Sequence, residues 1–147
     1  MAHAVVTTGH QNTNSNFIWR TGFIAAAISA VLNAAIFLIG RAADLVPSSV
    51  EVQSPTGEGA LTIVPVLLMS IVPVVVAVPV YLLIRHVESN PARVFRVVGG
   101  VLLVLSLLLP FGIPDVPLKM ALTLDLMHFV TGLAILVLIP GSDEQGA

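Results

Sequence analysis

The 147-residue chain has no cysteine, few charged residues and few aromatic residues. The lack of cysteine excludes disulfide bonds, thiolate metal sites and a cysteine nucleophile. Charged residues make up 10% of the chain, whereas a soluble domain has about 25%. The formal net charge of -2 gives no basic field for nucleic acid. A soluble protein and a nucleic-acid partner are therefore excluded, and the length indicates a single domain.

The sequence contains long apolar runs with few charged residues. A bilayer core about 30 Å thick needs about 20 apolar residues as a helix, whereas barrel strands would alternate over about ten residues. We therefore predict an all-α integral membrane protein, a four-helix bundle of antiparallel, up-down transmembrane helices. Asn90 as N-cap and Pro91 at the first helical position lengthen the third run. The helices are expected at about residues 17–40, 60–87, 91–109 and 120–140.

These helices form a predicted transmembrane domain over residues 17–140. Residues 1–16 are expected as a flexible polar N-terminal tail, and residues 141–147 as a C-terminal tail. The N-terminal tail has no Lys or Arg, unlike a secretory signal peptide, so the first helix is expected to be retained. The loop 41–59 should be mostly turn and coil, and its "SVEVQ" would form a short strand if it found a partner.

The basic residues predict the orientation, because cytoplasmic loops carry an excess of Lys and Arg. One end has Arg41 and Lys119. The other end has four arginines, namely Arg20, Arg85, Arg93 and Arg96. Both termini and the turn between the second and third helices are therefore expected in the cytoplasm, with the chain spanning a bacterial inner membrane. Phe17, Trp19 and Tyr81 lie where aromatic side chains would anchor helices at the headgroups.

Two features of the sequence concern helix packing. Small residues recur at every fourth position of the first helix, at Gly22, Ala26, Ala30 and Ala34. Such a stripe lets another backbone approach closely; packing inside the bundle is favoured, and a homo-oligomer interface is the alternative. Pro73 and Pro79 should kink the second helix. A fixed bend is favoured over a gating helix, because no second broken helix matches it.

Each predicted helix also carries a polar residue in the outer half of the membrane. At about 1.5 Å per residue, five residues fall within about 10 Å of a common level: Asn33, Ser70, Ser106, Asp125 and His128. Asp125, His128 and Gly132 share one face of the fourth helix. These five residues are the candidate intramembrane polar cluster. A structural role is favoured, in which hydrogen bonds tie the fourth helix to the first through Asn33.

Other roles stay open, because intramembrane ionisable residues are functional candidates by default. Asp125 and His128 would serve proton or small-ligand handling, and His128 alone would serve a tetrapyrrole contact. No metal site or other cofactor is expected, because one histidine and one carboxylate are too few for zinc. No nucleophile–base pair is recognisable, and Thr131 is interpreted as a packing hydroxyl. No catalytic residue and no enzyme activity are therefore predicted.

Four motifs resemble a family of small four-helix bacterial membrane proteins of unknown function, over residues 18–140. The motifs are "WR" (19–20), "NAAIFLIGRA" (33–42), "PARVFRVV" (91–98) and "LMHFVTGLAILVLIP" (126–140). The resemblance implies a four-span topology and places Asn33 and His128 in matching positions. It implies no activity, substrate or cofactor, and Asp125 lies outside the matched motifs.

Together these features predict a non-enzymatic accessory or scaffold subunit that packs against other membrane subunits. The small size, short stiff loops and small-residue stripe favour it. A small transporter is the alternative, but a solute path needs a continuous polar lining. The inner halves of the first, third and fourth helices offer almost no polar residues.

Overall fold

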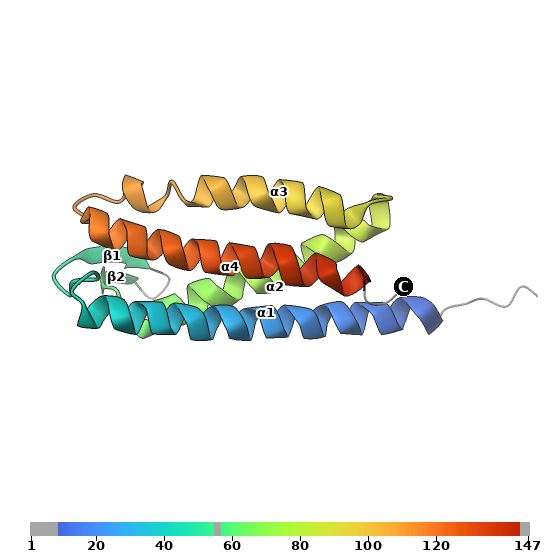
Figure 1. Ribbon diagram of the computed structural model, residues 1–147, viewed down its shortest axis with the longest axis horizontal. Coiled ribbons are helices and arrows are strands. Elements are labelled where there is room, and N and C mark those ends of the chain that lie inside the picture. Colours follow the sequence, from blue (N-terminus) through green and yellow to red (C-terminus); the bar gives the residue numbers. More distant parts are fainter. Residues whose placement is uncertain (1–8, 55–56, 145–147) are drawn as a thin grey trace, which may run out of the picture.

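Four long helices run antiparallel along one axis in the computed structural model (Figure 1), which describes residues 9–54 and 57–144. Their bounds are α1 Gly9–Ala42, α2 Ile63–Val87, α3 Pro91–Ser106 and α4 Leu118–Glu144. Each helix, α3 together with the turn after it, is long and apolar enough to span a membrane. The predicted four-helix membrane bundle is confirmed, and the chain is a multi-pass membrane protein.

The helices are arranged so that α4 lies at the centre of the contacts. α1 packs against α2 and α4, while α3 packs mainly on α4 and lies away from α1 (Figure 1). The start of α1, the end of α4 and the α2–α3 turn share one end of the bundle, here called the termini end. The other end, here called the hairpin end, holds the two strands and the α3–α4 loop.

The first and last helices of the chain, α1 and α4, are longer than the sequence predicted. α1 begins at Gly9 and α4 continues to Glu144, so residues 9–16 and 141–144 are helical where tails were expected. Once a helix has nucleated, each further residue adds a hydrogen bond for little ordering, which lets the apolar segments extend into polar sequence. Residues 1–8 and 145–147 lie outside the described residues, and their flexibility stays a prediction.

α3 has both ends set by proline. Its N-cap is as predicted, because the Asn90 side chain accepts a hydrogen bond from the Arg93 amide at 3.2 Å and Pro91 opens the helix. It ends at Ser106 rather than at residue 109. Pro110 has no amide proton for the Ser106 carbonyl, so the helix cannot continue and the chain forms a short 3-10 helix over Pro110–Gly112.

The loop after α1 contains a β-hairpin rather than coil alone. β1 Glu51–Ser54 pairs antiparallel with β2 Gly57–Ala60, with Glu51 opposite Ala60. The partner that "SVEVQ" needed is thus the glycine-rich second half of the same loop. Successive side chains of a strand alternate between faces, so Val52 is buried while Glu51 is exposed.

Two apolar clusters fill the bundle, one on each side of a polar layer. The cluster toward the termini end contains Ile18, Val74, Val78, Tyr81, Phe95 and Ile139. The cluster toward the hairpin end contains Phe37, Val46, Val52, Leu61, Val66, Met120 and Met127. Along α1, α2 and α4, the residues between these clusters include Asn33, Ser70 and Thr131.

Tyr81 is not an interfacial anchor, contrary to the sequence prediction. Its side chain is fully buried and packs edge-to-face on Phe95, with ring centroids 5.0 Å apart. An aromatic ring near the end of a helix buries its large apolar area wherever a neighbouring helix covers that face. Phe17 and Trp19 are each 37% exposed, as an anchor at the headgroups requires.

Candidate functional site

Asn33 joins three helices inside the bundle. Its Nδ2 donates to the Ser70 hydroxyl of α2 at 2.8 Å and to the Thr131 hydroxyl of α4 at 2.9 Å. Ser70 in turn donates to the carbonyl of Val66 at 2.7 Å. All three polar side chains are buried, so both amide protons of Asn33 are satisfied in an apolar surrounding. The predicted link between the first and fourth helices through Asn33 is present, with Thr131 as its partner.

Thr131 is the member of this site that sequence reasoning missed. The sequence indicates only a packing hydroxyl at Thr131, because it forms no recognisable nucleophile–base pair with His128 one turn away. A different signal was available: Met120, Met127 and Thr131 follow each other at helical spacing. All three residues are buried on α4.

Asp125 and His128 lie on another face of α4. Asp125 is two helical turns before Gly132, and Gly132 packs so tightly on Leu103 of α3 that a Cβ there would overlap that side chain. The face that carries Asp125 and His128 is therefore the flank beside α3. Both residues are half-buried. Among the described residues, neither forms a hydrogen bond to another helix, so the structure does not bring them into the Asn33 site.

The immediate partners of this pair are few. His128 Nδ1 lies 2.9 Å from the carbonyl oxygen of Leu124, one turn back on the same helix. Because a carbonyl only accepts, Nδ1 carries the proton, and Nε2 of the neutral ring keeps its lone pair. Asp125 Oδ1 is buried without a hydrogen-bond partner among the described residues.

Ser106 also stays outside the Asn33 site. Its hydroxyl donates to the Leu103 carbonyl of its own helix at 2.7 Å. The close contacts of Gly99 with Leu136 and of Leu103 with Gly132 fix the antiparallel register of α3 and α4. Continuing this register brings Ser106 to the level of His128. The predicted common depth therefore holds for Ser106, but its hydrogen bond is local.

His128 is the residue best placed to contact a metal-containing cofactor. A backbone carbonyl on Nδ1 with a free Nε2 is the arrangement that metal-binding histidines use. The residues that the structure describes contain no group of three or more His, Cys, Asp or Glu side chains able to hold a metal ion. Any such contact through the described part of this chain would thus rest on fewer than three ligands of these types.

The small-residue stripe of α1 faces the inside of the bundle. Gly22 and Ala26 are buried, and Ala30 and Ala34 are half-buried. A Cβ at Gly22 would overlap the Val78 side chain, so α2 approaches the α1 backbone there. The prolines of α2 that were expected to produce kinks, Pro73 and Pro79, lie on its exposed side, and α2 is helical through both.

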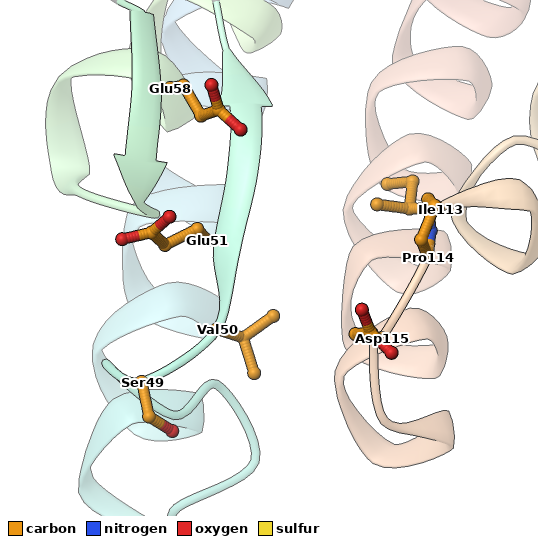
Figure 2. Close-up of a pocket in the computed structure, with 7 residues that line it drawn as sticks. All are labelled: Ser49, Val50, Glu51, Glu58, Ile113, Pro114 and Asp115. Carbon is orange, nitrogen blue, oxygen red and sulfur yellow. The ribbon is translucent and has the colours of Figure 1, made fainter.

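A cavity of about 500 Å³ opens at the hairpin end, between the hairpin segment and the α3–α4 loop (Figure 2). Sequence analysis did not anticipate it, because it depends on two loops meeting. Three of its lining residues are acidic. The lining consists of Ser49, Val50, Glu51, Glu58, Ile113, Pro114 and Asp115.

The fold and the Asn33 site together define a small four-span membrane bundle with a polar layer at its core. Residues 13–145 match the model of a family of unknown function, DUF6069, and the chain belongs to this family. The resemblance to an uncharacterised family that the sequence motifs indicated is thereby confirmed. No curated protein and no solved structure matches the chain.

Proposed function

We propose that the chain is a non-enzymatic accessory or scaffold subunit that packs in a larger membrane complex. The observation that carries this proposal is the position of Asp125 and His128. Both lie within a membrane span, half-buried on the flank of α4, and no other described helix satisfies them. Polar groups within a membrane span are costly, and they are usually covered by protein that offers hydrogen-bonding partners.

The apolar cluster at the termini end supports a packing role over transport. It fills the bundle between the Asn33 site and that end, and Tyr81, Ile18 and Ile139 in it have no exposed surface. A solute or ion would have to cross this cluster, in which the Tyr81 hydroxyl is a single polar side-chain group among apolar ones, so most of its water shell would not be replaced. Among the described residues, the polar layer therefore does not continue as a polar path toward the termini end.

Site-specific photo-crosslinking in native membranes tests this role. Phe129, next to His128 and 47% exposed, is replaced by a photo-reactive phenylalanine derivative. We expect a discrete adduct with a second membrane protein, and a several-fold lower yield when Asp125→Asn is added, because the carboxyl group that the partner would bind is removed. An adduct of twice the chain mass would make the partner a second copy.

The matched control places the same probe at Val72, which is 52% exposed on α2. Val72 lies close to Ser70 and so near the same depth, but on a flank without ionisable residues. We expect only diffuse lipid adducts there. If the folded protein gives the same crosslinking pattern at Phe129 as at Val72, with no discrete adduct specific to Phe129, the accessory role is contradicted.

Such a result would favour the second candidate, a proton- or ligand-handling protein. Asp125 Oδ1 and His128 Nε2 support this candidate, because neither atom has a hydrogen-bond partner among the described residues. A single tetrapyrrole contact through His128 draws on the same nitrogen.

We further propose that the chain resides in a bacterial inner membrane with its termini end in the cytoplasm. The four arginines near that end support this orientation, because positive loops are retained inside. The cysteine-free sequence allows a direct check with two exposed serines. A membrane-impermeant maleimide added to intact cells should label Ser48→Cys at the hairpin end and spare Ser89→Cys in the α2–α3 turn. Labelling of Ser89→Cys but not of Ser48→Cys would mean that the bundle has the opposite orientation in the membrane.

A further inference from the structure

Three polar groups around Asn33 have hydrogen-bonding capacity that the protein leaves unused. Ser29 has no exposed surface and Asn33 is 3% exposed, yet Ser29 Oγ and Asn33 Oδ1 have no hydrogen-bond partner among the described residues. The buried Thr131 hydroxyl accepts from Asn33 Nδ2. Its own proton reaches no acceptor in the described part of the chain.

These groups lie together. Ser29 and Asn33 are one helical turn apart on the buried face of α1, and Thr131 is bonded to Asn33 from α4. The pairs Asn33–Ser70 and Gly22–Val78 fix the register of α1 against α2, which places Val74 opposite Ser29. Val74 is buried and apolar, so α2 provides no partner for the Ser29 hydroxyl. A buried polar group without a partner loses the hydrogen bonds that it would make with water, so such a group is destabilising unless something binds it.

We propose that one water molecule binds at this point of the bundle, bridging Ser29, Asn33 and Thr131. It accepts from the two hydroxyls and donates to Asn33 Oδ1, giving the three hydrogen bonds that a buried water typically forms. The unused groups are two donors and one acceptor, a set that one water complements. A cation fits less well, because Asp125, the ionisable acid nearest in sequence to Thr131, lies on the other flank of α4.

Infrared difference spectroscopy of the full chain in lipid bilayers tests the site. Spectra of the wild type minus Ser29→Ala are recorded in ordinary water and in water enriched in heavy oxygen. We expect an O–H stretching band in the wild type that shifts with the isotope and is lost in Ser29→Ala. Ser106→Ala, which removes a hydroxyl already bonded within α3, should leave the band unchanged.

Several outcomes would overturn the assignment. Without an isotope-sensitive band, the Ser29 hydroxyl must turn onto a backbone carbonyl instead. A band that persists in both Ser29→Ala and Thr131→Val would belong to water elsewhere. A sodium- or potassium-dependent thermal stabilisation that Ser29→Ala abolishes would make the occupant a cation. Helicity from circular dichroism checks each variant, and Thr131→Val serves if Ser29→Ala does not fold.

Discussion

Replacing Asn33 with leucine should lower the free energy of unfolding by about 1–2 kcal/mol, the upper part of the range for hydrogen bonds between membrane helices. The change keeps the side-chain size similar but removes both inter-helix bonds, to Ser70 and to Thr131. Because lipid is as apolar as leucine, the new side chain gains no compensating burial. Reversible unfolding of the purified chain in mixed micelles measures the change.

The matched control for Asn33→Leu is Ser106→Ala. Ser106 lies at a similar depth, but it bonds only within its own helix, so we expect a change within about 0.5 kcal/mol. A double-mutant cycle of Asn33→Leu with Thr131→Val should give a coupling of about 0.5 kcal/mol or more. Additive effects would mean that the two side chains do not stabilise each other.

The sequence was sufficient for the spans, because length and hydropathy alone decide which segments fit a bilayer. It also placed Asn33 and Ser70 at one level, since depth follows from the rise per residue. The sequence did not determine how each helix is rotated about its own axis, and therefore which residues face the neighbouring helices. Rotation depends on tight contacts such as Gly22 on Val78 and Gly132 on Leu103, which belong to pairs of helices.

That missing rotation explains the differences at the candidate site. Asp125 and Thr131 lie on the same helix, about 9 Å apart along its axis, yet Thr131 faces α1 while Asp125 flanks α3. In the sequence, Asp125 and His128 are stronger site candidates than Thr131, because ionisable side chains within a membrane span are costly and usually functional. The buried tie was formed instead by a neutral amide and two hydroxyls. The two amide protons of Asn33 are satisfied by these hydroxyls inside the bundle, without a partner from outside it.

The helix register itself can be tested at glycine, where the largest destabilisation is expected. Gly22→Ala adds a methyl group that overlaps the Val78 side chain. Valine is stiff at χ1 and Val78 is almost fully buried, so α1 and α2 must separate. Overpacking of this kind costs about 1–3 kcal/mol, measured as a lower midpoint of thermal or denaturant unfolding.

Two further glycines make the Gly22 prediction specific. Gly132→Ala should cost less than Gly22→Ala. Its methyl group meets the Cγ and both Cδ atoms of Leu103, but Leu103 is only half-buried and has a second side-chain torsion through which it can move away. Gly100→Ala meets open space and should gain up to about 1 kcal/mol from helix propensity. This order follows from contacts between helices, since all three substitutions add the same group to a helix interior. If all three variants were equally destabilised, the α1–α2 and α3–α4 registers would be wrong, and with them the placement of Val74 opposite Ser29.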